Sequence, residues 1–218
     1  MFNSKAYFIL CGILIMILVS CSDSTSYGII ETDFGEMKVE LYNSTPSHRD
    51  NFVKLAKEGF YDDLLFHRVM KGFMIQGGDP DSKGAPAGSP LGMGGPGYTI
   101  DQEIGAPHFK GCLAAARTPD SGNPEKKSSG SQFYIVQGQQ QSREDLQARS
   151  AQKGIEYNED QIAKYENIGG RPDLDMEYTV FGEIVSGMEV IDKIAAIQTD
   201  SRNRPRQDLK MKIRITSN

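Results

Sequence analysis

Positive charge is in short supply in this sequence. Its 24 lysine and arginine residues are outnumbered by 29 aspartate and glutamate residues, which gives a formal net charge of −5. Nucleic-acid binding draws on a basic excess that neutralises phosphates, so we expect no nucleic-acid partner. The 218 residues, of which 38% are hydrophobic, are instead typical of a globular chain that buries its core within one domain.

Metal-binding motifs are also missing. The sequence contains neither a CxxC nor an HExxH motif, and its three histidines lie far apart, at His48, His67 and His108. Zinc sites need closely spaced cysteine or histidine ligands, so we expect no metal ion.

A hydrophobic run lies near the start of the chain. One lysine precedes an apolar stretch over residues 6–19, which is typical of a secretory signal peptide and short for a membrane-spanning helix. The run ends in Leu18-Val19-Ser20-Cys21, which resembles the bacterial lipobox, where the cysteine is lipidated and becomes the mature N-terminus. We predict a signal peptide at 1–20, lipid on Cys21 and a linker over 21–26. An uncleaved membrane anchor is the alternative.

This N-terminus predicts a location outside the cytoplasm. We expect a lipid-anchored protein of the bacterial cell envelope that faces the periplasm. Cys11 would leave with the signal peptide and Cys21 would carry lipid, so Cys112 alone would remain in the domain. An intrachain disulfide is then impossible, and Cys112 is interpreted as a small core residue.

Residues 27–218 show the pattern of one mainly β domain. Apolar-rich runs predict a hairpin over 27–42, and helical spacing predicts one helix after Thr45, the expected N-cap, and another over 188–197. Further strands are predicted at 66–70, 72–76, 111–116, 132–137, 178–185 and 209–215. Strands that do not alternate with helices favour an antiparallel sheet closed as a barrel. The polar stretch 139–173 is interpreted as an insertion with one or two short helices.

One arginine stands among apolar strand residues. Alternation along a strand predicts that Arg68 points to the face opposite His67 and Val69. An arginine in such surroundings is costly unless it is hydrogen-bonded, so it either has an internal partner or binds the carbonyl of a ligand. The residues by themselves leave both interpretations open.

Four segments together resemble a known family. Residues 66–80, with the sequence FHRVMKGFMIQGGDP, resemble the signature of the cyclophilin family of peptidyl-prolyl isomerases. Segments 111–117, 129–135 and 178–188 resemble further blocks of that family, and the similarity runs in order from residue 27 to 216. The resemblance implies an eight-stranded antiparallel barrel closed by two α-helices.

The resemblance also implies an activity, which is cis/trans isomerisation of X-Pro bonds without a cofactor. Arg68 matches the catalytic arginine, which stabilises the pyramidal prolyl nitrogen of the twisted amide, and Gln76 matches the residue that orients it. The residues implied to bind substrate are Phe73, Met74, Tyr134 and Leu174 around the proline ring, Ala116, Arg117 and Gln132 along the residue before proline, and Gln76 and Tyr178 beside them.

Some positions depart from the family pattern. Tyr134 stands where many members have phenylalanine, and its hydroxyl must find a partner or face solvent. Tyr178 replaces a histidine of the eukaryotic type, and Asp173 stands where that type has tryptophan, a residue this sequence lacks entirely. Because that tryptophan is associated with cyclosporin binding, we expect weak inhibition by the drug.

The expected function is therefore an envelope-tethered, monomeric isomerase that assists the folding of exported proteins. Its expected partners are proline-containing peptides and unfolded exported chains. The alternative is a non-catalytic chaperone or scaffold of the same fold, in which the 139–173 insertion recruits a partner.

Overall fold

The computed structural model describes residues 25–217, so the predicted signal peptide and the predicted lipid site at Cys21 lie outside the described residues. Within 25–217, no helix is both long and apolar enough to cross a membrane. The helices are α1 (Pro46–Lys57), α2 (Arg143–Lys153), α3 (Glu159–Asn167) and α4 (Met188–Ala195), with short 3-10 turns at Pro80–Ser82, Asp120–Gly122 and Pro172–Leu174.

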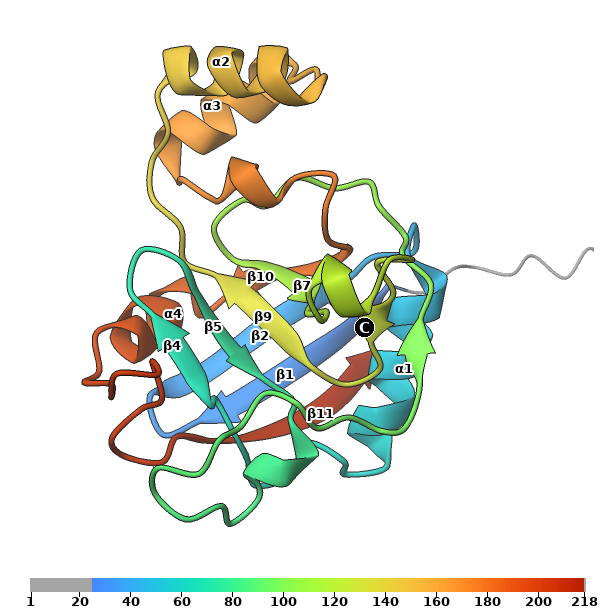
Figure 1. Ribbon diagram of the computed structural model, residues 1–218, viewed down its shortest axis with the longest axis vertical. Helices are drawn as coiled ribbons and strands as arrows, with labels where there is room; N and C mark the ends of the chain where they lie inside the picture. The colour runs from blue at the N-terminus through green and yellow to red at the C-terminus, as the bar shows by residue number, and fades with distance from the viewer. Residues whose placement is uncertain (1–24, 218) are drawn as a thin grey trace, which may run out of the picture.

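One antiparallel sheet forms the body of the molecule (Figure 1). Its strand order is β3-β11-β1-β2-β10-β7-β9-β5-β4, and a separate two-stranded ribbon pairs β6 with β8. The strands are β1 (Ser26–Thr32), β2 (Gly35–Leu41), β3 (Leu64–Leu65), β4 (Arg68–Met70), β5 (Met74–Gly77), β6 (Thr99–Ile100), β7 (Cys112–Ala115), β8 (Ser128–Ser129), β9 (Phe133–Val136), β10 (Val180–Ser186) and β11 (Lys210–Ser217).

The two edges of the sheet meet. The edge strands β3 and β4 stand at opposite ends of the strand order, yet only Phe66 and His67 separate them in the chain. The sheet must therefore curl round on itself, which confirms the predicted antiparallel, barrel-like class. The strand count is nine and not the expected eight, because β3 has two residues and is too short to show alternation.

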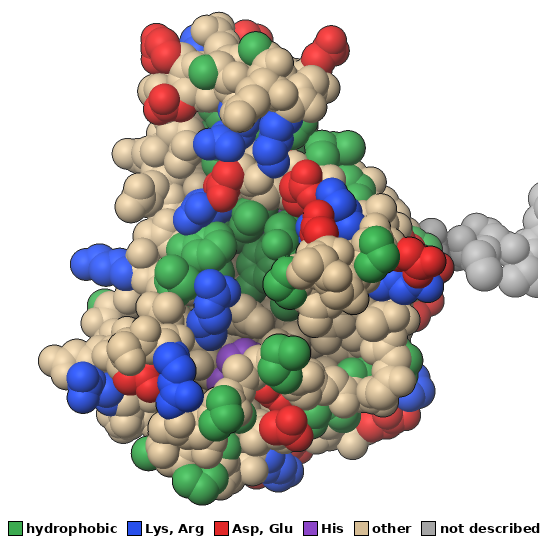
Figure 2. All heavy atoms as spheres, viewed as in Figure 1, with side chains coloured by type: hydrophobic (Ala, Val, Ile, Leu, Met, Phe, Trp, Pro, Cys, Tyr) green, Lys and Arg blue, Asp and Glu red, His purple; other side chains and the backbone are tan. Residues whose placement is uncertain are grey.

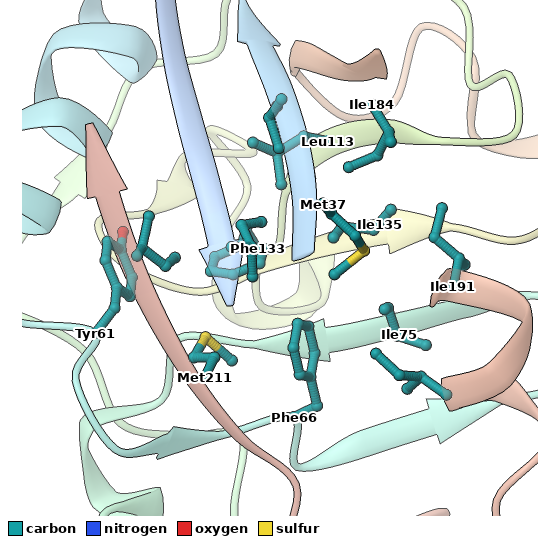
Figure 3. Close-up of a cluster of buried hydrophobic side chains, with 14 of the residues drawn as sticks. Met37, Tyr61, Phe66, Ile75, Leu113, Phe133, Ile135, Ile184, Ile191 and Met211 are labelled. Atoms are coloured by element: carbon teal, nitrogen blue, oxygen red, sulfur yellow. The ribbon is translucent and has the colours of Figure 1, made fainter. Parts of the chain in front are cut away.

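The concave side of the sheet holds the main core (Figure 3). Side chains from most strands point to a common centre, where Phe133 contacts the rings of Phe52, Tyr61 and Phe66. Helix α1 buries Phe52 against this core, and α4 buries Ile191. The predicted pair of closing helices is thereby confirmed. Cys112 is buried and free, as the sequence predicted.

The start of α1 differs from the prediction in one detail. Thr45 precedes the helix, but its hydroxyl donates to the Tyr42 carbonyl and makes no capping bond. The carboxylate of Glu103 instead accepts from the backbone N–H groups of Ser47 and His48, at 3.1 and 3.0 Å. A distant residue thus satisfies the free donors of the first turn, which local sequence patterns do not predict.

The predicted insertion forms a small helical lobe above one end of the sheet (Figure 1). Helices α2 and α3 bury Leu146, Ile162 and Tyr165 between them, with Phe109 of the barrel packed against this cluster. At its base, Gly170 forms β-bridges to both Phe109 and Gln139. A side chain at position 170 would lie 2.3 Å from the His108 carbonyl, so glycine is needed for this close approach.

Candidate active site

Arg68 and Gln76 face each other across a hairpin. The antiparallel register of β4 and β5 sets Arg68 opposite Gln76, and Arg68 Nη1 donates to Gln76 Oε1 at 3.1 Å. Gln76 Nε2 then donates to Gln132 Oε1 at 3.0 Å, and Gln132 Nε2 donates to the Gly94 carbonyl at 2.7 Å. This chain of amides, ending on backbone, holds the Arg68 side chain in one orientation.

The Arg68 guanidinium is a cation that no carboxylate neutralises. Among residues 25–217, Gln76 is its side-chain hydrogen-bond partner, and no acidic group lies within ion-pair distance. Burial lowers the pKa of Arg68, but the usual value for arginine is so high that the group keeps its charge at neutral pH. Of the two interpretations left open by the sequence, the internal partner is confirmed as Gln76, and Arg68 also lines a cavity.

A cavity of about 340 Å³ lies in front of this arginine. Figure 2 shows it as a hollow beneath the insertion, with apolar side chains inside and cationic groups at the rim. Phe73 and Arg68 approach each other, with the guanidinium carbon 5.7 Å from the ring centre. The apolar part of the lining includes Phe73, Met74, Ala116, Tyr134, Leu174 and Tyr178.

A second hollow adjoins the first across Ala116 and Gln76. It is lined by Arg117 and Gln132 as well, and by the glycine-rich loop over residues 92–97. Arg117 is held in place because its Nε donates to the Glu177 carbonyl at 3.2 Å and its guanidinium lies 4.6 Å from the centre of the Tyr178 ring. The two hollows form an open groove, with an apolar end and an end rich in amide and backbone groups.

The predicted substrate-binding residues lie together around the two hollows. Eight of the nine line the first cavity together with Arg68, and Gln132 lines the second. The expectation for His67 was wrong: it lines the first cavity beside Arg68, because it precedes β4 and strand alternation does not apply to it. Sequence reasoning also did not assign other lining residues to the site, and these come from two distant loops: Ser89, Pro90, Leu91, Gly92, Arg202 and Arg204.

The hydroxyl of Tyr134 has a buried partner. Tyr134 is 5% exposed, and its oxygen lies 3.0 Å from Nε2 of His108, a fully buried side chain. Burial raises the pKa of the Tyr134 hydroxyl well above its usual value, so the group stays protonated. The departure from phenylalanine at this position is therefore accommodated inside the protein. No cluster of acidic, histidine or cysteine side chains within residues 25–217 could hold a metal ion.

Comparison with known families identifies this arrangement. Residues 27–216 match the family model described as cyclophilin type peptidyl-prolyl cis-trans isomerase/CLD. The chain belongs to the cyclophilin family. Peptidyl-prolyl cis-trans isomerisation is accordingly the activity of this cyclophilin domain. The expected antiparallel barrel class and the expected isomerase activity are both confirmed, although the sheet has nine strands and not eight.

Several relatives share most of this cyclophilin domain. A Staphylococcus aureus protein named as a peptidyl-prolyl cis-trans isomerase is 32% identical over 182 residues, which cover 83% of this chain and 86% of that protein. A Streptococcus pyogenes protein named as a bifunctional phosphatase/peptidyl-prolyl cis-trans isomerase is 34% identical over 190 residues. That match covers 83% of this chain and 36% of the relative, so this chain spans about a third of the relative's length.

Solved structures agree with this assignment. A crystal structure of a Cryptosporidium parvum cyclophilin type peptidyl-prolyl cis-trans isomerase superposes with a TM-score of 0.63 at 26% identity, covering 89% of this chain and 99% of the other. A second structure of that protein, determined in the presence of the dipeptide Ala-Pro, gives a TM-score of 0.61 at 26% identity and covers 88% and 99% of the two chains.

Proposed function

We propose that Arg68 catalyses the isomerisation by stabilising the twisted prolyl amide. Rotation about an X-Pro bond removes the amide resonance, and the prolyl nitrogen becomes pyramidal and gains a localised lone pair. A guanidinium that donates to this nitrogen binds the twisted form more tightly than either planar isomer, which is what lowers the barrier. The observation that carries the proposal is the Arg68 cation, held by Gln76 at the edge of the apolar cavity and not neutralised by any carboxylate of residues 25–217.

Each of the two hollows would bind a different part of the substrate. The apolar cavity suits the proline ring, which Phe73, Met74, Tyr134 and Leu174 would surround, with Tyr178 beside them. Ala116, Arg117 and Gln132 lie where the residue before proline would pass, and their amide and backbone groups suit a neutral peptide. Burial of the ring supplies affinity while the bond that rotates stays outside the cavity. The Ala-Pro dipeptide studied with the Cryptosporidium relative is consistent with such a ligand.

Substitution of Arg68 tests this mechanism. In a protease-coupled assay on a succinyl-Ala-X-Pro-Phe peptide, Arg68→Ala should lower kcat/KM by about a hundredfold or more, the loss usual for a donor that acts in the transition state. Arg68→Lys keeps the charge but loses the forked donor, so it should restore little activity. Arg143→Ala is the control, since that arginine pairs with Glu159 on the insertion and does not line the cavity.

Retention of full activity by Arg68→Ala would contradict the mechanism. A bacterial phenotype that Arg68→Ala leaves unchanged would favour the non-catalytic binding module instead.

We also propose that the protein works in the bacterial cell envelope, tethered by lipid on Cys21, where it assists folding of exported proteins. The support is the sequence alone, namely the apolar run over 6–19 and the lipobox-like end. Tethering would concentrate the isomerase where exported chains emerge. Cys21→Ser should abolish incorporation of labelled palmitate and move the protein out of the membrane fraction. A wild-type protein that carries no lipid would contradict the anchor.

A further inference from the structure

The buried carboxylate of Asp175 joins the insertion to the barrel. Its Oδ1 accepts hydrogen bonds from the backbone N–H and from Nδ1 of His108, at 2.7 and 2.9 Å. Its Oδ2 accepts from the hydroxyls of Tyr157 and Tyr165, at 2.8 and 2.7 Å. Asp175 is 3% exposed, and a buried carboxylate is stable only where donors surround it. Two of these four donors belong to the insertion.

His108 extends this network to the wall of the catalytic cavity. Because Oδ1 of Asp175 accepts the bond from the histidine ring, the hydrogen is assigned to Nδ1 of His108, and this tautomer leaves Nε2 as an acceptor. The Tyr134 hydroxyl, 3.0 Å from Nε2, is then the donor. The rings of His108 and Tyr134 stack with their centres 6.1 Å apart and their planes 13° from parallel. Tyr134 lines the cavity and His108 does not, so the O–H bond is directed away from the substrate.

The two tyrosines of the insertion are packed against other aromatic rings. The ring of Tyr165 lies 4.5 Å from that of Phe109 and 5.8 Å from that of Tyr157, centre to centre. A backbone hydrogen bond also joins the base of the lobe to the segment that precedes β7. In it, the N–H of Arg171 donates to the His108 carbonyl at 2.8 Å. Burial and the nearby Asp175 raise the pKa of both tyrosines, so both remain hydroxyl donors at neutral pH.

We propose that Tyr157 and Tyr165 are positioning residues for the proline pocket, acting on Tyr134 through Asp175 and His108. The proposal rests on the placement of Tyr134 in the proline pocket under the proposed function. It gives the 139–173 insertion a role inside the enzyme, in addition to any contact it makes outside. While His108 holds the Tyr134 hydroxyl, the cavity presents a ring surface to proline, as phenylalanine would. A released hydroxyl would bring an unpaired polar group to that surface, at a cost to proline binding.

A pair of conservative substitutions tests the network in the full chain. Tyr157→Phe/Tyr165→Phe keeps both rings and removes two donors from Asp175. KM for the proline peptide should rise about threefold to tenfold with kcat within about twofold, because the proline ring is bound in the ground state and the transition state alike. In a Tyr134→Phe background the same pair should cause no further rise in KM, since no hydroxyl is left to position.

The control is Tyr42→Phe. Tyr42 is half-buried, and its burial together with the nearby Glu183 raises the pKa of its hydroxyl, so it is a partly buried tyrosine outside the network. This variant should leave KM unchanged.

A second measurement needs no variant. Nitrogen-15 spectra of the histidine ring nitrogens are easily assigned in a chain with three histidines, and His108 should carry its hydrogen on Nδ1. Three results would overturn the proposal: a hydrogen on Nε2 of neutral His108, an unchanged KM in the folded double variant, or an equal rise in KM with and without the Tyr134 hydroxyl. Failure of the proposed function would look different, as activity independent of Arg68 with the histidine spectrum as expected.

Discussion

At the scale of single residues, the site depends on which side chains lack a charged partner. Arg117, Arg143 and Arg171 each pair with a carboxylate, whereas Arg68 is bonded to the neutral amide of Gln76. A neutral partner orients a guanidinium without neutralising its positive charge, and the remaining N–H donors stay available to a substrate. The difference between an amide and a carboxylate at position 76 should therefore decide the activity.

Gln76→Glu is the direct test of that difference. The substituted carboxylate has the same shape as the amide but would form an ion pair with Arg68, and it could no longer donate to Gln132. We expect kcat/KM to fall about tenfold or more, which corresponds to roughly 1.4 kcal/mol of lost transition-state stabilisation. Gln147→Glu, an exposed change on α2, is the control for the added charge. An unaffected kcat/KM in Gln76→Glu would contradict the role given to the neutral partner.

At the scale of elements, the helices differ in how their ends are satisfied. Helix α1 takes its cap from the distant Glu103, whereas α3 carries its own capping box. The Asn158 side chain accepts from the Gln161 N–H at 2.9 Å, and the Gln161 side chain accepts from the Asn158 N–H at 3.0 Å. Because α3 is a short helix that presents Tyr165 to Asp175, its local stability bears on the buried network.

Loss of the capping box should loosen the insertion without unfolding the barrel. Asn158→Ala should lower the stability of α3 by about 1 kcal/mol, the usual cost of removing an N-cap. Hydrogen exchange of the α3 amides should then accelerate by roughly fivefold, which is the change in the opening equilibrium that about 1 kcal/mol produces. The amides of β7 and β9 should stay protected. Asn167→Ala makes the same chemical change at the other end of α3 and should have a smaller effect. Equal acceleration in both variants would argue against the cap.

At the scale of the whole molecule, buried histidines link stability to pH. Burial lowers the pKa of His48, although its hydrogen bond to Glu103 at 2.6 Å opposes the shift, and burial lowers the pKa of His67. A histidine whose folded pKa lies below its unfolded value binds fewer protons in the folded state. Its contribution to the free energy of unfolding is therefore present above about pH 6.5 and is lost as the pH falls below that value.

Acid should accordingly destabilise the protein before its carboxylates titrate. Between pH 7.5 and pH 5.5, the free energy of unfolding should fall by about 1–2 kcal/mol, measured from urea unfolding curves. His67→Gln removes one of the two groups and should reduce the loss. Equal urea midpoints at pH 5.5 and pH 7.5 would show that the prediction is wrong. They would mean that both histidines bind protons equally in the folded and unfolded states.

Local patterns in the amino-acid sequence were sufficient for most elements and for the family. Apolar-rich runs predicted β1 and β2, helical spacing predicted α1 and α4, and the run around Arg68 carried the resemblance to cyclophilins. These features depend on neighbours within a few residues, which is the range that side-chain periodicity reports. The predicted lipid anchor rests on the same kind of local pattern and lies outside the described residues.

Contacts between distant segments required the tertiary structure. The Glu103 cap on α1, the position of His67 in the cavity and the cavity walls from residues 89–92 and 202–204 have no local signature. The link from Tyr165 to Tyr134 crosses four segments that only the curled sheet brings together. A buried polar group takes whichever partner the packed chain delivers, so the amino-acid sequence shows that Tyr134 needs a partner, and only the fold decides that it is His108.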